Sequence, residues 1–580
     1  MAQDLEVALA HHQAGRLQAA TAIYREALRA EPGNTDALHL LGVIEQQLGR
    51  HEEAIRLIEQ AIAAAPGRPE FHNNLGEACR ALGRMADAER SYRAALALDA
   101  DFAAANGNLG NVLLAQERLR EAEKSFRRAA ALEPGNPEFH HNLAVALHGT
   151  GRLHEAETSC RTTLALRPEM AEAHSILAIV LLELGRLEEA EQSACRAIAL
   201  RPGFAEAHNI LGNTLRELGR LDEAEKSCRQ AIALKPDFAE AHNHLAVVLF
   251  ALGRMDEAER SYRQAIAYKP DYTEAHVNLS QLRLLRGDFA GGWKEYTWRW
   301  KRSDMALPDI PERTLWRGTE DLKGKTILLL AEQGLGDTIH FARYAPLVAA
   351  RGANVIVEVP RVLAPLMAGT PGIGRVIASE GGPRPSADYV CPLLSLPHAF
   401  RTTLADIPPP LPHLHSVQAR GEDWRNDLKG KKGEKLVGLC WRGNPNYAGD
   451  RFRSIPLALL EPLLKIPGLR FVSLQKELHA DELALVKPLR NFVHQGEDFR
   501  STAEIIAGLD MVISVDTVWA HWAGTIGKPV WLMISHPPHW CWLLGRDDSP
   551  WYPSARLFRQ PASGDWKSVI GNVGAELARR

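Results

Sequence analysis

The feature that most constrains this chain is a 34-residue repeat that fills its first half. Glycine recurs at this step, and Glu117 occupies the one place in the series where glycine is missing. The glycines are Gly15, Gly49, Gly83, Gly151, Gly185, Gly219, Gly253 and Gly287. Each unit has room for two amphipathic helices with a turn at the glycine. A chain built in this way folds as a stack of helix pairs, because each unit can bury its apolar face only against its neighbours.

Two more residue types follow the same period. Alanine stands five residues after the glycine position, where a small side chain lets two helices cross closely, and proline ends most units. The alanines are Ala20, Ala54, Ala88, Ala122, Ala156, Ala190, Ala224 and Ala258, and the prolines are Pro32, Pro66, Pro134, Pro168, Pro202, Pro236 and Pro270. This pattern resembles the tetratricopeptide repeat over about nine units, residues 1–306. The resemblance implies an α-helical superhelix that binds protein.

A histidine series with this period is a tempting metal site. Its members are His72, His140, His174, His208, His242 and His276. Successive repeats lie about 10 Å apart, on the order of a helix diameter, so these imidazoles cannot share one ion. We expect them to pack between repeats, and we predict no metal site.

Composition excludes several classes of function. A net charge of −3 gives no support for attraction to nucleic acid or to a membrane. The seven cysteines are dispersed without a CxxC pair, which argues against a disulfide framework and a zinc site. The first residues lack the basic and apolar regions of a signal peptide, and no apolar run is long enough to span a bilayer. We therefore expect a cytoplasmic protein without membrane insertion.

The second half differs in composition. All 13 tryptophans lie at or after Trp293, and the aromatic, basic stretch 293–325 is typical of a packed junction rather than of a flexible linker. Short apolar runs then alternate with helix-like segments, which predicts parallel sheets covered on both faces. The predicted strands are Thr326–Ala331, Asn354–Val359, Leu436–Cys440, Arg470–Leu474, Met511–Val515 and Val530–Ile534. The proline-rich, charged stretch 408–434 separates two Rossmann-like lobes, 307–412 with the junction and 433–580.

The first predicted strand runs into a glycine-rich turn that ends at Asp337. We expect Gly334 and Gly336 to permit a tight turn, with a helix beginning near Asp337. Ligands of open α/β folds bind at such carboxyl ends of strands. A carboxylate there can act as a general base, although aspartate is also a favoured helix N-cap.

Two further segments follow strands of the second lobe. Asp516 and Thr517 precede a helix that contains His521, and a helix N-terminus suits a phosphate group without a metal. An ordinary strand–cap–helix unit is the alternative for this segment. Arg453 lies on a predicted loop where arginine could clamp phosphate oxygens, or the loop could simply be solvated.

Together these motifs resemble the heptosyltransferase-like glycosyltransferases (family 9), which have the two-lobed GT-B fold. The resemblance covers residues 325 to about 570. It implies that Asp337 is the catalytic base. Arg453-Ser-Ile-Pro456 stands in place of the family's phosphate-binding Lys-x-Trp-Pro, and residues 516–521 match its Asp-Thr-Gly-x-x-His donor motif except for Val518 in place of glycine. In architecture the chain is similar to bacterial repeat-containing transferases, some of which glycosylate flagellin, and to the O-GlcNAc transferases.

The resemblance implies inverting, metal-independent transfer of a sugar from a nucleotide-sugar donor to a protein, with the sugar O-linked to Ser or Thr and no cofactor. The donor-binding residues would be Gly334, Gly336, Arg453, Asp516, Thr517 and His521. Asn74, Asn108, Asn142 and Asn278 recur at one repeat position, and in O-GlcNAc transferases such a ladder binds the peptide acceptor. Capture by the repeats and chemistry in the lobes would then be separable near residue 290. Two alternatives are a non-catalytic repeat scaffold with a degenerate transferase domain, and a transferase of lipid or polysaccharide whose repeats bind a partner protein.

Overall fold

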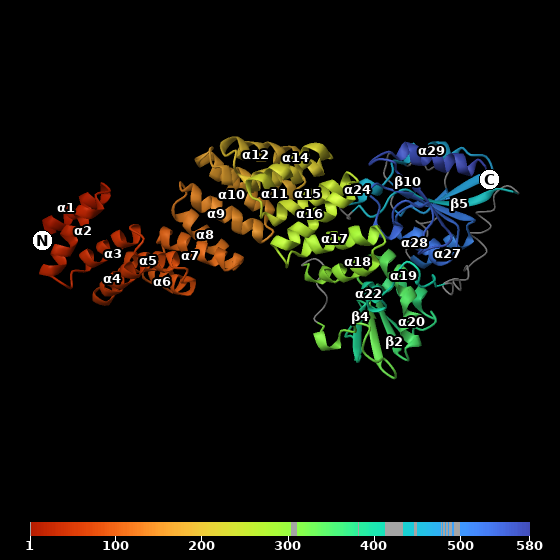
Figure 1. Cartoon of the computed structure of the whole chain (residues 1–580), viewed down its shortest axis with the longest axis horizontal. Coiled ribbons are helices and arrows are strands. Elements are labelled where there is room, and N and C mark those ends of the chain that lie inside the picture. The colour runs from red at the N-terminus through yellow and green to blue at the C-terminus, as the bar shows by residue number, and fades with distance from the viewer. Residues whose placement is uncertain are drawn as a thin grey trace. The chain divides into compact units, whose positions relative to one another are not determined.

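The computed structural model describes residues 2–302, 310–380, 382–411, 433–445, 449–476, 478, 482, 485, 490–491 and 499–579. The chain divides into two compact units, Met1–His244 and Leu245–Arg580 (Figure 1). The first unit is helical. The second contains the last repeat helices together with two parallel sheets. Among the described residues, no helix combines the length and the apolar character needed to cross a bilayer.

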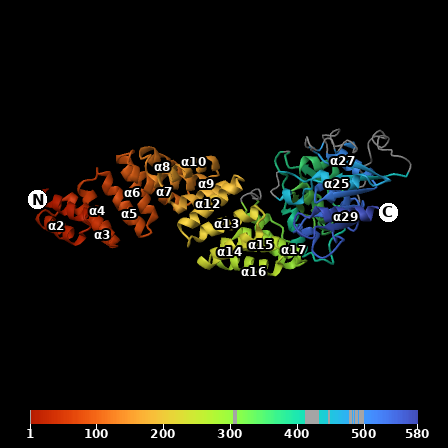
Figure 2. The same cartoon turned by 90° about the horizontal axis from the view of Figure 1, so that it is seen from above.

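The first unit is a row of antiparallel helix pairs (Figure 2). Its helices are α1 (Ala2–Gln13), α2 (Leu17–Ala30), α3 (Thr35–Gln47), α4 (His51–Ala64), α5 (Pro69–Ala81), α6 (Met85–Leu98), α7 (Ala103–Ala115), α8 (Leu119–Leu132), α9 (Pro137–Gly149), α10 (Leu153–Leu166), α11 (Ala171–Glu183), α12 (Leu187–Leu200), α13 (Ala205–Glu217) and α14 (Leu221–Leu234). The predicted solenoid of helices is therefore confirmed.

The turns and crossings of the pairs follow the periodic residues. Every glycine of the series has a positive φ, between 72° and 83°, and Glu117, which stands where glycine is missing, has φ 58°. Glycine suits this left-handed conformation because it has no Cβ atom. The eight periodic alanines are fully buried, so a larger side chain would push the paired helices apart.

The histidine series has a more specific role than packing. Each imidazole Nε2 lies 2.9–3.1 Å from the carbonyl oxygen of the residue six positions earlier, which is the proline that ends the preceding unit. In one repeat Asn106 takes the histidine position, and its Nδ2 donates to the carbonyl of Ala100 at 3.2 Å. The series therefore holds the turn between successive repeats.

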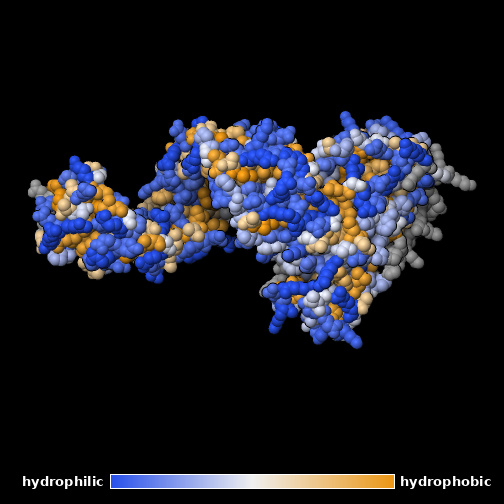
Figure 3. Space-filling view, viewed as in Figure 1, coloured by the Kyte–Doolittle hydropathy of each residue, from blue (hydrophilic) through white to orange (hydrophobic). Residues whose placement is uncertain are grey.

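Arginines after the glycines form a second periodic network on the surface. Arg186 pairs with Glu189 of its own helix at 2.6 Å and with Glu157 of the preceding repeat at 2.7 Å. Arg220 pairs with Glu223 and Glu191 in the same way. The visible face of the repeats is accordingly largely hydrophilic, with scattered apolar patches (Figure 3). Such exposed pairs contribute about 0–1 kcal/mol each.

Helix α15 (Ala239–Ala251) spans the boundary between the units. The second unit continues with α16 (Met255–Tyr268), α17 (Thr273–Leu285), α18 (Phe289–Tyr296) and the 3₁₀ helix η1 (Thr297–Lys301). Its first sheet has the order β3-β2-β1-β4 and is parallel throughout. The strands are β1 (Thr326–Leu330), β2 (Asn354–Val359), β3 (Arg375–Ala378) and β4 (Tyr389–Pro392), and the helices of this lobe are α19 (Leu335–Phe341), α20 (Ala345–Ala350), α21 (Ala364–Met367) and α22 (Leu396–Ala399).

The second sheet has the order β10-β9-β8-β5-β6-β7, and all its described pairs are parallel. The strands are β5 (Lys435–Cys440), β6 (Leu469–Ser473), β7 (Arg490–Asn491), β8 (Met511–Val515), β9 (Val530–Ile534) and β10 (Ala555–Arg559). The helices are α24 (Asp450–Arg453), α25 (Leu457–Leu464), α27 (Phe499–Gly508), α28 (Val518–Thr525) and α29 (Trp566–Leu577). Counted along the chain, this is the 3-2-1-4-5-6 order of doubly wound folds, whose ligands bind where the order reverses. The reversal lies between β5 and β8.

The last repeat and the sheets share one hydrophobic core. Leu284, Leu285, Phe289 and Trp293 are buried in the same cluster as residues of β1, β2 and α28. Trp293 packs against aromatic rings of both lobes, at 6.2 Å from Phe341 and 5.2 Å from Trp540 between ring centroids. The expected packed junction is therefore present at Trp293, before residues 303–309. Those seven residues of the predicted junction lie outside the described part of the chain.

This core argues against a cut near residue 290, where the sequence predicted that capture and chemistry separate. A fragment of residues 290–580 loses Leu284, Leu285 and Phe289 from the cluster, and each fully buried side chain of this kind contributes about 1.5–3 kcal/mol. We expect a fragment of residues 237–580, which keeps α15 to α18, to melt cooperatively, and the 290–580 fragment to melt at a much lower temperature or to aggregate. Circular dichroism melts of the two fragments check this expectation. Equal melting temperatures would contradict it.

Candidate functional site

Asp337 lies at the third position of α19, directly beyond the carboxyl end of β1. The helix begins at Leu335, two residues earlier than expected, and the Asp337 Oδ2 accepts a hydrogen bond from the Gly334 N–H at 3.2 Å. This contact differs from the N-cap role that the sequence offered as an alternative, because Gly334 is the N-cap and Asp337 binds the N–H of that residue from inside the first turn. Asp337 is also half-buried. Burial raises the pKa of its carboxyl, with a further rise from Asp516, whereas His539 and His521 act in the opposite direction. A carboxylate with a raised pKa is a better proton acceptor than an exposed one.

The two glycines of this turn have other roles than the one expected. The left-handed residue is Gln333, with φ 61°, whereas Gly334 has φ −85°. Gly336 is needed for close approach, because a Cβ atom there would lie 3.0 Å from the His521 Cδ2. Glycine at position 336 therefore lets α19 pack directly on α28.

Asp516, in the turn before α28, contacts His521 of that helix. The His521 Nε2 lies 3.4 Å from the Asp516 Oδ1, and its Nδ1 lies 2.9 Å from the Tyr552 hydroxyl. Burial alone would raise the pKa of Asp516, but the hydrogen bond with His521 and the electrostatic influence of His521, His539 and Arg453 lower it below its usual value. Asp516 is thus held as a carboxylate while it fixes the orientation of the imidazole.

Thr517 occupies the N-cap position of α28 without capping it. Its hydroxyl makes no hydrogen bond to the helix amides and lies 2.9 Å from the Ser514 hydroxyl instead. Its Oγ1 also lies 3.9 Å from the Sγ of Cys440, at the end of β5. The threonine therefore ties together the carboxyl ends of β5 and β8, where the strand order reverses.

Arg453 lies on the short helix α24 rather than on the expected loop. Its Nε donates to the Asp450 Oδ1 at 2.8 Å, and its Nη1 donates to the backbone carbonyl of Asp516 at 3.0 Å. Asp450 is buried and also accepts a hydrogen bond from the Ser454 hydroxyl at 2.6 Å. Any side chain at Gly443 would overlap Asp450 and Arg453. The guanidinium is therefore fixed beside the Asp516 turn.

The sequence did not single out His539, which joins this group. Part of its surface is exposed, and it lowers the pKa of both Asp337 and Asp516 electrostatically. Desolvation by the surrounding protein lowers the pKa of His539, and the two carboxylates oppose that change. The aromatic stretch around it, His536–Trp542, was the available signal.

The structure thus brings together the predicted catalytic and donor-binding residues from both lobes. Close packing of α19 on α28 places the Asp337 turn against the Asp516 turn. Arg453 lies beside the same turn, because its guanidinium donates to the Asp516 carbonyl. Within the described part of the chain, no group of three or more His, Cys, Asp or Glu residues is arranged to hold a metal ion.

The four asparagines of the predicted acceptor ladder are half-buried on the first helices of their repeats. In the first unit their amides contact neighbouring side chains. The Nδ2 of Asn108 donates to Asn73 at 3.1 Å and to Glu77 at 3.0 Å. The Nδ2 of Asn74 lies 2.7 Å from the His39 Nε2, and that of Asn142 donates to Asn111 at 3.0 Å. Asn278 belongs to the second unit. The three amides of the first unit thus bridge successive repeats, whether or not a peptide also binds them.

Comparison with known proteins supports the presence of tetratricopeptide repeats in the helical half of the chain. A tetratricopeptide-repeat family model matches residues 193–239, 210–266 and 245–292. The model of the cilia and flagella-associated protein 70 C-terminal domain matches residues 2–209. The chain therefore carries tetratricopeptide repeats.

Particular relatives cover only part of the chain. Protein FlbA of Caulobacter vibrioides is 30% identical over 326 residues, which is 51% of this chain and 54% of FlbA. The chain thus spans about half the length of this relative. Among solved structures, the APC/C hetero-tetramer Cut9–Hcn1 is 19% identical, with a TM-score of 0.37 over 47% of this chain and 54% of that one. A thermophilic tetratricopeptide-repeat protein of Thermus thermophilus, TTC0263, is 28% identical, with a TM-score of 0.28 over 30% of this chain and 95% of that one.

The Asp516–His521 pair predicts a pH-dependent contribution to stability. Because the folded-state pKa of Asp516 lies below the unfolded one, the carboxylate stabilises the fold above about pH 4, and this contribution is lost as the pH falls toward the folded-state pKa. We expect Asp516→Asn to lower the free energy of unfolding by about 1–3 kcal/mol at pH 7. The difference in melting temperature between the wild type and Asp516→Asn should become smaller as the pH falls from 5 to 3.

Thermal melts across this pH range measure the gap. Asp271→Asn, at an exposed aspartate, is the control and should show little gap at any pH. A gap for Asp516→Asn that stays constant with pH would show that the carboxylate charge is not what stabilises the site.

Proposed function

We propose that this chain is an inverting GT-B glycosyltransferase that moves a sugar from a nucleotide-sugar donor to a protein held by its repeats. The observation that carries the proposal is the meeting of Asp337, Arg453 and the Asp516 turn at the carboxyl ends of strands from two parallel sheets. In open α/β folds this is where ligands bind. A site supplied by both sheets suits a reaction between two substrates.

The proposed reaction begins with Asp337. Its carboxylate takes the proton of an acceptor Ser or Thr hydroxyl, and the resulting oxygen attacks the anomeric carbon of the donor sugar. The bond between that carbon and the diphosphate oxygen breaks, and the nucleoside diphosphate leaves with the electron pair. Attack on the face opposite the leaving group inverts the anomeric configuration. The raised pKa of Asp337 favours its role as the proton acceptor.

The leaving diphosphate requires positive charge and hydrogen-bond donors. We assign this task to Arg453 and to the N-terminus of α28, where Val518 and the following residues begin the helix. His521 would support the same turn through Asp516. Gly334 would serve the site through its N–H, which holds Asp337, and Gly336 through the close packing of α19 against His521. The proposal involves no metal ion and no other cofactor.

A second candidate function is a non-catalytic repeat scaffold with a degenerate transferase domain. The observation that favours it is Val518 at the first position of α28, because the resembling family has glycine there. A transferase of lipid or polysaccharide, with repeats that bind a partner protein, is the third reading. Donor binding and acceptor identity separate the three.

The decisive variant for catalysis is Asp337→Asn. It keeps the size and the helix-capping oxygen of aspartate but cannot take a proton, so we expect turnover to fall by about 10²–10⁴-fold with donor affinity and melting temperature little changed. Product formation with a panel of nucleotide sugars and donor binding by calorimetry measure the two effects. The control is Asp321→Asn, at an exposed aspartate that lies before the amino end of β1, whereas Asp337 lies beyond its carboxyl end. Near wild-type turnover of Asp337→Asn would mean that Asp337 only caps α19.

The decisive variant for capture combines Asn108→Ala with Asn142→Ala. If both amides also bond an acceptor backbone, acceptor affinity should fall by about 1–3 kcal/mol, at about 0.5–1.5 kcal/mol for each hydrogen bond, while donor affinity stays unchanged. Acceptor pull-down and melting temperature are measured on the same protein. A loss of stability with full acceptor binding would show that these asparagines only bridge repeats.

A further inference from the structure

The turn that carries Asp337 is held from outside its own lobe. We call residues 331–337 the Asp337 loop. Two of its side chains, Glu332 and Gln333, are bound by residues at the end of the last repeat, Arg299 and Tyr296. Nothing in the proposed chemistry uses these four side chains directly.

The Arg299–Glu332 contact is a bidentate ion pair. The Arg299 Nη2 lies 2.6 Å from one oxygen of Glu332, and its Nε lies 3.0 Å from the other. The guanidinium is only 1% exposed and also donates to the Ser395 hydroxyl at 2.7 Å and to the Tyr296 carbonyl at 3.0 Å. Glu332 also accepts the backbone N–H of Leu394 at 3.1 Å. A fork-shaped pair of this kind fixes orientation as well as position.

The Tyr296–Gln333 contact holds the strained residue of the loop. Gln333 has φ 61°, a conformation that side-chain-bearing residues rarely adopt. Its Nε2 donates to the Tyr296 hydroxyl at 2.9 Å. Burial raises the pKa of that hydroxyl, so the phenol keeps its proton. A left-handed residue persists only where its surroundings hold it in place.

We propose that Tyr296 and Arg299 are positioning residues, which hold the Asp337 loop in the shape that presents Asp337 to the acceptor hydroxyl. The proposal rests on the function proposed above. Both residues act through the loop and not through contact with substrate. It follows that the segment that ends the last repeat, which carries Tyr296 and Arg299, also shapes the proposed site.

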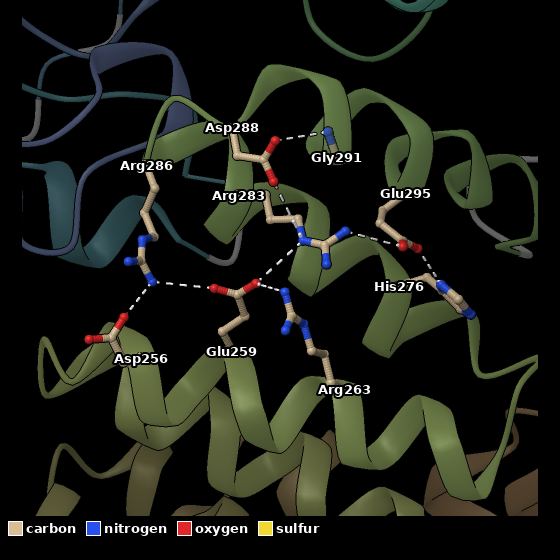
Figure 4. Close-up of polar contacts among 9 residues, drawn as sticks. All are labelled: Asp256, Glu259, Arg263, His276, Arg283, Arg286, Asp288, Gly291 and Glu295. Carbon is tan, nitrogen blue, oxygen red and sulfur yellow. Dashed lines mark hydrogen bonds and ion pairs between the residues drawn. The ribbon is translucent and has the colours of Figure 1, made fainter.

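The same repeat supplies a matched control. Arg283 of α17 lies in a charged network with Glu259 of α16 at 3.5 Å, Glu295 of α18 at 3.4 Å and Asp288 at 3.8 Å (Figure 4). Like Arg299 it is an arginine in ion pairs at the end of the repeats. Its contacts join repeat helices to one another and do not include the Asp337 loop.

The test compares Tyr296→Phe, Arg299→Gln and Arg283→Gln in the full chain. Backbone amide hydrogen exchange over residues 331–338 reports the loop directly and needs no enzymatic activity. We expect exchange to speed up at least several-fold in Tyr296→Phe and Arg299→Gln, and to stay as in the wild type in Arg283→Gln. Arg299→Gln removes the ion-pair partner of Glu332 and leaves only the Leu394 N–H bound to it, so Tyr296→Phe, which removes one oxygen, is the variant to rely on if Arg299→Gln does not fold.

Kinetics supply the second readout. With the donor that supports turnover, kcat should fall by about 10- to 100-fold in Tyr296→Phe, since misplacing a reacting group by about 1 Å can cost 10²-fold, while the donor Kd changes less than twofold. Arg283→Gln should lower the melting temperature and keep kcat. In a Gln333→Leu background, Tyr296→Phe should have no further effect, because the two groups act as one contact.

The outcomes separate this proposal from the proposed function. Absence of turnover in the wild type with every nucleotide sugar would overturn the proposed function, while the exchange measurement would still show whether Tyr296 and Arg299 hold the loop. Unchanged loop exchange in Tyr296→Phe, or an equal increase in Arg283→Gln, would overturn the positioning role. Faster loop exchange with an unaltered kcat would overturn it as well.

Discussion

The burial of Trp293 is the interaction on which the second unit depends. Its ring lies 5.7 Å from Phe289 of the same helix, 6.2 Å from Phe341 of α19 and 5.2 Å from Trp540, which follows β9. One side chain thus contacts the last repeat and both sheet lobes. Loss of a buried tryptophan typically costs about 3–5 kcal/mol, so the repeat end and the lobes are stable together. The candidate site is built directly on this core, because α19 carries both Phe341 and Asp337.

The pKa values of the two nearby carboxylates shift in opposite directions because His521 is hydrogen-bonded to Asp516 and not to Asp337. Asp337 is half-buried, and burial raises its pKa. Asp516 is in similar surroundings but is paired with His521, and its pKa is lowered. Environments that separate the pKa values of neighbouring acids are how active sites divide roles between them. In the proposed reaction the first exchanges a proton, and the second keeps its charge and holds the donor turn.

The sequence predicted the inner parts of the fold better than its edges. The predicted helix pairs were found because the period marks each turn, and all six predicted strands exist to within one residue at each end. The four strands that the sequence did not indicate, β3, β4, β7 and β10, are the edges of the two sheets. Inner strands of a parallel sheet are covered on both faces and read as continuous apolar runs. An edge strand such as Arg375–Ala378 is half-exposed and carries no such signal.

Contacts between segments far apart in the sequence could not be predicted at the candidate site either. Asp337, Asp516 and Thr517 could be predicted because each follows an inner strand, whereas Arg299 and Tyr296 act 33 and 37 residues away along the chain. The link depends on a change in the repeat itself. The second helices of other repeats have 14 residues, but α18 has eight. A full-length helix beginning at Phe289 would run past Arg299. Helix α18 instead ends at Tyr296, and the chain turns into η1. Tyr296 and Arg299, three positions later, can therefore contact the Asp337 loop.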